Sequence, residues 1–177
     1  MNDVASVSAY GVQTEPATVR IQRLLPGPIE RVWAYLTESD LRRQWLAAGP
    51  MELKVGGELE LVWRNDELTS HVEPRPPGFE SEHRMKSHVT RIDPPRLLVF
   101  TWGAGDVTFE LERKGGEVLL TVTHRRLSGR DGMLGVSAGW HAHLDILVDR
   151  VSGREPGPFW STWSRLRAEY AERITGA

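Results

Sequence analysis

A change of hydrophobic period near Gly132 constrains the fold of this chain more than any other feature. Upstream, between about residues 51 and 127, apolar residues alternate with polar ones, which is typical of half-buried strands. Downstream, over residues 134–151, apolar residues recur every three or four positions, which is typical of a helix with one buried face. We therefore expect a meander of strands followed by one long helix. This order suits a curved sheet that wraps around the helix.

The strand-like region predicts an antiparallel sheet of six or seven strands. Gly56-Gly57 and Gly115-Gly116 are tight-turn signals, and Pro94-Pro95 marks a further turn. Short turns between consecutive strands require antiparallel pairing. Residues 65–82 are polar, contain three prolines and predict a long surface loop. The expected strands are 18–25, 51–55, 58–63, 84–92, 97–102, 107–113 and 117–127.

Two short helices are expected between the first two strands. Pro28 stands at a first-turn position, where its missing N–H costs nothing. Apolar residues with helical spacing follow up to Leu36, and a second short helix covers residues 41–46. Each helix carries one tryptophan, Trp33 and Trp45, and we expect both side chains to be largely buried.

Two further helices are expected after the strands. The long helix over 134–151 carries a stripe with His143 on its flank, and a last helix begins at Pro158 with a stripe of its own. An isolated helix of about 17 residues is marginal in water, so the last helix must pack on its own domain, which we favour, or on a second copy. The first stripe is Val136, Trp140, Leu144, Leu147 and Val151; the second is Phe159, Trp163, Leu166, Tyr170 and Ile174.

Together these elements predict an α+β helix-grip fold. Its curved antiparallel sheet of six or seven strands wraps around the long C-terminal helix and encloses a cavity, and an extra terminal helix follows. Residues 1–16 are small and polar without a period, so a flexible N-terminal segment is expected there. The helix-grip domain is expected over 17–153, and residues 154–177 form a C-terminal extension helix packed on the domain.

Composition excludes several classes of function. The chain of 177 residues has no cysteine, which rules out disulfides and thiolate chemistry. Its formal net charge is −2 without a basic stripe, so we expect no nucleic-acid partner. No run approaches the roughly 20 apolar residues that span a bilayer, and no signal peptide is visible, so no membrane association and a cytoplasmic location are expected.

A set of short motifs, in a fixed order over about residues 17–153, resembles the activator of Hsp90 ATPase homologue-like family. This family is part of the START and Bet v 1-like (SRPBCC) superfamily. The resemblance implies a helix-grip fold. It carries over no catalytic residue, because the family has no shared catalytic motif. The motifs are Pro28-x-x-x-Val32-Trp33-x-x-Leu36-Thr37, Leu41-x-x-x-Trp45, Val55-Gly56-Gly57, Asp93-Pro94-Pro95-Arg96-Leu97, Val99-Phe100-Thr101-Trp102 and Gly139-Trp140-x-x-x-Leu144-x-x-Leu147.

No pattern of catalytic or metal-binding residues stands out. His141 and His143 are two positions apart on a predicted helix, about 200° around its axis, so they cannot share one metal ion. No HExxH spacing and no Gly-x-Ser-x-Gly motif occurs. Glu58 and Glu60 alternate with leucines, so we expect them to face solvent. We therefore predict no metal, no cofactor and no catalytic residue.

Aromatic side chains are the strongest remaining signal. Several of them fall on the strands and the helix that a helix-grip fold brings together. They either fill the core or line an apolar pocket that holds a few polar groups. The candidate lining residues are Trp63, Arg84, His88, Phe100, Trp102, His124, Trp140, His143, Leu144 and Leu147.

Three functional hypotheses follow, in order of preference. The first is a non-catalytic protein whose interior cavity binds a small hydrophobic molecule. The second is a co-chaperone-like module that binds a protein partner, and the third is a cyclase- or hydrolase-type enzyme. The first and third need a cavity open to solvent, whereas the second does not. Either a monomer or a homodimer is compatible with all three.

Overall fold

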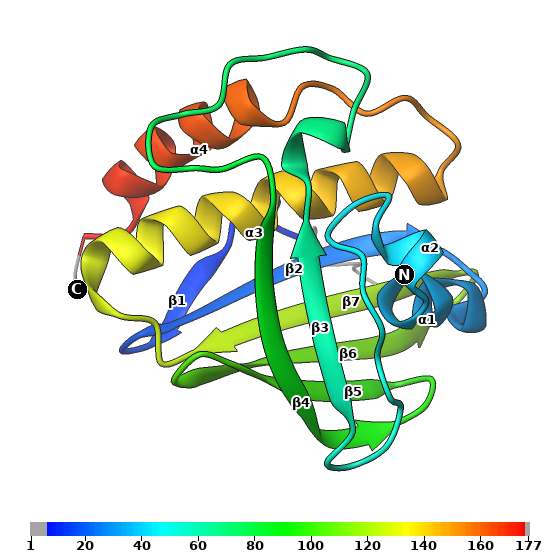
Figure 1. Cartoon of the computed structure of the whole chain (residues 1–177). Helices are drawn as coiled ribbons and strands as arrows, with labels where there is room; N and C mark the ends of the chain where they lie inside the picture. Colours follow the sequence, from blue (N-terminus) through cyan, green and yellow to red (C-terminus); the bar gives the residue numbers. More distant parts are fainter. Residues whose placement is uncertain (1–6, 176–177) are drawn as a thin grey trace, which may run out of the picture.

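The computed structural model describes residues 7–175 and contains one antiparallel sheet of seven strands. The sheet curves around the long helix α3, as Figure 1 shows, and its strands follow the order β1-β2-β7-β6-β5-β4-β3. Every neighbouring pair is antiparallel, as predicted. The strands are β1 (Val12–Glu15), β2 (Thr18–Pro26), β3 (Glu58–Trp63), β4 (His83–Asp93), β5 (Leu97–Trp102), β6 (Gly105–Lys114) and β7 (Glu117–Arg125).

The helices lie at three places around this sheet. Helices α1 (Ile29–Thr37) and α2 (Ser39–Arg42) connect β2 to the segment before β3, and the short η1 (Asn65–Glu67) follows β3. Helix α3 (Gly129–Val151) crosses the concave face of the sheet, and α4 (Trp160–Arg173) packs on the side of α3 away from the sheet (Figure 1). The fold is therefore the α+β arrangement that the sequence predicts.

The core lies between the concave face and α3. Leu59, Leu61 and Trp63 of β3 are buried, as their alternation predicts, whereas Glu58 is exposed. Most of the predicted stripes is also buried, because α3 packs on the sheet and α4 packs on α3. The buried members are Trp140, Leu144, Leu147, Val151, Phe159, Leu166, Tyr170 and Ile174; Val136 and Trp163 are half-buried.

Two parts of the sheet differ from the sequence prediction. Within the N-terminal segment expected to be irregular, Val12–Glu15 forms the edge strand β1, which pairs with β2. The strand expected over 51–55 does not form, because only Met51 makes a bridge, to Leu59. The chain instead folds back on itself, so that a Cβ at Gly57 would lie 2.3 Å from the carbonyl oxygen of Glu52. The alternating Leu53 and Val55 are consequently exposed.

Two helical predictions also need correction. Helix α3 starts at Gly129, five residues before the predicted start at 134, and so includes a stretch of glycines and charges that carries no apolar period. Trp45 is fully buried, and its indole N–H donates to the carbonyl of Tyr35 at 2.8 Å. Trp33, in contrast, is only half-buried on α1, because Val32 and Leu36 supply the inward face of that helix.

The guanidinium of Arg42 is a fully buried cation. Among the described residues it has no carboxylate within ion-pairing distance; its N–H groups donate to backbone carbonyls instead. Nε donates to Ala47 at 3.0 Å, one terminal nitrogen to Leu36 and Thr37 at 3.3 and 3.1 Å, and the other to Gly49. Burial lowers the pKa of Arg42 to about 10, so the group stays charged at neutral pH. Arg42 therefore ties the end of α1 to the chain that follows α2.

Replacing Arg42 should destabilise the fold strongly. In Arg42→Met the carbonyls that accept these bonds lose their donors inside the protein, and each unsatisfied buried group costs about 1–3 kcal/mol. We expect the free energy of unfolding, measured by urea denaturation, to fall by at least about 3 kcal/mol. Arg43→Met, at the exposed neighbouring position, is the matched control. Equal losses in the two variants would show that the buried network contributes little.

Candidate functional site

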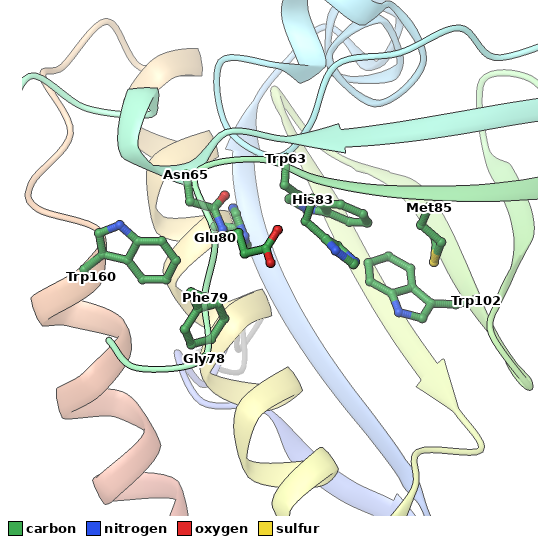
Figure 2. A pocket seen from close by; sticks show the side chains of 10 residues that line it. Trp63, Asn65, Gly78, Phe79, Glu80, His83, Met85, Trp102 and Trp160 are labelled. Carbon is green, nitrogen blue, oxygen red and sulfur yellow. The ribbon is translucent and has the colours of Figure 1, made fainter. Parts of the chain in front are cut away.

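A pocket open to solvent lies where the ends of β3 and β5 and the start of β4 meet the helices α3 and α4 (Figure 2). It consists of two adjoining hollows of about 490 and 290 Å³. Both hollows share six lining residues, of which four are aromatic. The shared residues are Trp63, Asn65, Phe79, Trp102, His143 and Trp160.

Trp63 and Trp102 form an aromatic wall of the pocket because both stand at the ends of strands. Trp63 is the last residue of β3 and points to the same face as Leu59 and Leu61, and Trp102 ends β5. Their ring centroids lie 5.3 Å apart in an edge-to-face arrangement. Trp102 also lies 5.6 Å from Trp140 of α3. These contacts form one continuous aromatic surface from the edge of the sheet to the central helix.

The loop between η1 and β4 builds the opposite wall because it is fastened to α4. The carboxylate of Glu73 accepts the backbone N–H groups of Trp160 and Ser161 at 2.9 and 3.0 Å, at the positive end of that helix. The ring of Phe79 packs against both Trp160 and Trp163, with centroids 4.9 Å away in each case. Figure 2 shows Phe79 and Trp160 across the pocket from Trp63 and Trp102.

His143 contributes a polar group to this apolar surface. Its Nδ1 lies 2.8 Å from the carbonyl oxygen of Trp45. Since a carbonyl only accepts, Nδ1 carries the proton, and Nε2 of the neutral ring is left as an acceptor. Burial lowers the pKa of His143 to about 4, against the smaller opposite effect of the bond to Trp45. The ring is therefore uncharged at neutral pH.

Asn65 is the second polar residue shared by the hollows. It lies two residues after the end of β3, at the first position of η1. Its side-chain oxygen is buried and has no hydrogen-bond partner within residues 7–175. The carboxylate of Glu80 and the ring of His83 line only the larger hollow, and both residues are exposed. Polar groups are thus sparse in the shared part of the pocket.

His124 supports the pocket without lining it. Its Nδ1 accepts the indole N–H of Trp140 at 3.0 Å, and its ring lies 5.0 Å from that of Trp102. Burial lowers the pKa of His124 to about 4, so this acceptor remains available at neutral pH. The bond fixes the orientation of Trp140 between sheet and helix.

The structure brings together some of the predicted lining residues. Trp63, Trp102, Trp140 and His143 line the pocket. Phe100, Leu144 and Leu147 are buried in the core and do not line it.

Arg84 and His88 require a correction, because both lie exposed on the outer face of β4. Arg84 pairs there with Glu60 and Glu82, each at 3.0 Å. Before the register shift between Val89 and Arg91, the inward positions of β4 have odd numbers, such as Met85 and Val89, so Arg84 and His88 face away from α3. The identity of the residues alone did not reveal this parity.

Several lining residues were missed by sequence reasoning. Phe79 and Asn65 belong to a segment expected to be only a surface loop. Trp160 lies between Phe159 and Trp163 and is not part of the stripe assigned to the last helix. The side chains of His83 and Met85 lie on the side of β4 that faces the pocket. Phe79, the one aromatic residue of Phe, Tyr or Trp type in this proline-rich loop, was the available signal that the loop packs against the rest of the protein.

The curved antiparallel sheet around α3 defines a helix-grip protein of the SRPBCC superfamily. Residues 26–152 match the family described as Activator of Hsp90 ATPase homolog 1-like protein. The chain therefore belongs to this family, as the resemblance of its motifs suggested. No curated protein sequence matches the chain.

Solved structures agree with this assignment. The protein encoded by gene BPP1335 from Bordetella parapertussis is 38% identical, with a TM-score of 0.79 over 98% of this chain and 96% of that chain. EF2215 from Enterococcus faecalis, described as a conserved protein of unknown function, is 22% identical with a TM-score of 0.67 over 91% of this chain and 87% of its own. CalU16 from Micromonospora echinospora is 20% identical, with a TM-score of 0.63 over 91% and 92% of the two chains. The last two likenesses concern the fold alone.

Residues 7–175 contain neither a candidate membrane-spanning helix nor a candidate metal-binding cluster. No helix in this range is both long and apolar enough to cross a bilayer. No group of three or more histidine, aspartate or glutamate side chains in the same range is arranged to hold a metal ion.

Because His143 is buried in its neutral form, the stability of the fold should depend on pH. The ordinary pKa of histidine is 6.5 and that of folded His143 is about 4, so the unfolded chain binds more protons between these values. The free energy of unfolding should therefore fall as the pH drops from about 6.5 towards 4. In His143→Asn, whose amide can still donate to Trp45, the fall between pH 7 and 5 should be smaller by about 2 kcal/mol.

Urea denaturation at the two pH values measures this difference. His88→Asn controls for removing a histidine from the outer surface. If His143→Asn loses as much stability between pH 7 and 5 as the wild type, His143 does not resist protonation in the folded chain.

Proposed function

We propose that this protein binds a small hydrophobic molecule, without catalysis, in the pocket between the sheet edge and helices α3 and α4. The observation that carries the proposal is the aromatic composition of the wall shared by the two hollows, with Trp63 and Trp102 on one side and Phe79 and Trp160 on the other. Ligand sites are commonly concave, mostly apolar and provided with a few polar groups that orient the ligand. A volume of about 490 Å³ in the larger hollow falls in the range typical of such sites.

The way the wall is built supports the same proposal. Large aromatic side chains left open to solvent forgo the hydrophobic gain of burial, unless something covers them. Trp102 is half-buried and Phe79 is exposed, although each contacts other aromatic rings. An apolar ligand would complete the burial of these rings. The protein partner, the homodimer and the cytoplasmic location named above stay predictions beside this proposal.

A neutral fluorescent probe tests the proposal. N-phenyl-1-naphthylamine, whose emission rises in apolar surroundings, should bind saturably at one site per chain. Trp102→Ala should weaken binding by about tenfold, because it removes a ring from the pocket wall. Trp33→Ala is the matched control, since Trp33 is equally half-buried but lies on α1 and does not line the pocket.

Each outcome has a clear reading. A loss in Trp102→Ala with unchanged affinity in Trp33→Ala supports the pocket as the binding site. Equal effects of the two substitutions place the probe elsewhere. No saturable binding at all would contradict the proposal and favour the interaction-module hypothesis.

A further inference from the structure

Two hydrogen-bond acceptors belong to side chains that line both hollows of the pocket. The buried side-chain oxygen of Asn65 has no partner among the residues that the structure describes. Nε2 of His143 is an acceptor as well, because the proton on Nδ1 is engaged with the carbonyl of Trp45. Asn65 and His143 each line both hollows, so both side chains belong to the same site. A buried acceptor without a donor costs free energy until a donor reaches it.

The charges of the residues that line the pocket indicate which kind of hydrogen-bond donor a ligand carries. The six residues shared by the hollows include no Asp, Glu, Lys or Arg, and the ring of His143 is uncharged at neutral pH. The carboxylates that do line the pocket, those of Glu80 and Asp131, belong to exposed residues, each in only one of the two hollows. An ammonium group placed at Asn65 and His143 would lose its hydration without gaining a buried counter-ion. A neutral hydroxyl or N–H group meets no such cost.

The shape and chemistry of the walls indicate the rest of the molecule. Trp63 and Trp102 meet at 5.3 Å on one side, and Phe79 and Trp160 meet at 4.9 Å on the other. Aromatic rings pack favourably against further rings in edge-to-face or offset arrangements. A flat ring system held by these walls can direct a substituent towards Asn65 and His143. Figure 2 shows the side chain of Asn65 between those of Trp160 and Trp63.

We propose that the ligand is a flat, uncharged aromatic molecule bearing a hydroxyl or N–H donor, and that this donor bonds to one of the two acceptors, Asn65 Oδ1 or His143 Nε2. The inference rests on the proposed function and adds the chemical class of the ligand. It also assigns different roles to the residues of the site: the aromatic rings supply affinity, whereas Asn65 and His143 select for the donor.

Two probes of nearly equal shape test the class of ligand. 2-Naphthol carries a donor, and 2-fluoronaphthalene carries at the same position a substituent of similar size that cannot donate. Competition with the fluorescent probe gives the affinity of each. The intact chain should bind 2-naphthol at least about fivefold more tightly, because only this probe can donate a hydrogen bond to one of these acceptors.

Variants of the two acceptors show whether the preference arises at them. Asn65→Leu removes one acceptor and His143→Asn removes the Nε2 acceptor. In the variant that lacks the acceptor used, the ratio of the two affinities should fall to about half or less, with little change for 2-fluoronaphthalene. Asn65→Asp keeps an oxygen at the same position and should keep the preference. Glu67→Gln, at an exposed position of η1 that does not line the pocket, should also keep it. Thermal unfolding of each variant verifies that the fold is retained.

The possible failures are distinguishable. If neither naphthalene displaces the fluorescent probe and the probe itself does not bind, the proposed function is wrong and this inference falls with it. If both naphthalenes bind with equal affinity, and Asn65→Leu changes neither, the pocket binds apolar molecules but does not select a donor. A preference that persists in both Asn65→Leu and His143→Asn also overturns the inference.

Discussion

The buried guanidinium of Arg42 holds the segment on which the core and the pocket both depend. Its carbonyl partners span residues 36 to 49, a stretch with little regular structure of its own beyond the short α2. Within this stretch Trp45 fills the space between the sheet and α3, 6.5 Å from Phe109, and offers its carbonyl to His143. A cation without a buried counter-ion is costly, so the carbonyl dipoles that surround Arg42 must be fixed in place. The same rigidity sets the position of the His143 ring at the floor of the pocket.

Polar contacts of this kind recur at each junction between layers. Trp140 of α3 donates to His124 of β7, which joins the central helix to the sheet. His141 of α3 and the N–H of Gly11 both meet the hydroxyl of Tyr170 on α4, at 2.9 and 2.7 Å. Apolar packing alone would allow α3 and α4 to slide along one another, whereas directional bonds at fixed points do not. Hydrophobic burial therefore supplies most of the stability, and these few bonds select one arrangement of the layers.

The sequence predicts the layers well and the site only in part, and the residues show why. Alternation over Leu59, Leu61 and Trp63 and the stripe through Trp140 and Leu144 follow directly from the period of a strand and of a helix, so the fold is predictable. Parity is harder to assign for a strand such as β4, where charged residues and half-buried residues alternate without a clear apolar face. The sequence therefore suggests His88 as a pocket residue, whereas the structure has His83 in the pocket lining. The roles of Arg42, Asn65 and Phe79 depend on contacts between segments far apart in the chain, and no local pattern encodes these.

The fastening of the long loop to α4 has a consequence for how such proteins diverge. One side of the pocket is formed by Trp63 and Trp102, which stand at the ends of strands that pair within the sheet. The other side depends on Phe79, in a loop that Glu73 anchors to the first turn of α4. Helix α4 lies beyond residues 26–152, the part of the chain that matches the family. Insertions or substitutions in this loop and in α4 can reshape the pocket while the sheet and α3 stay intact. Two homologous chains with superimposable sheets can accordingly differ in the molecules they accept.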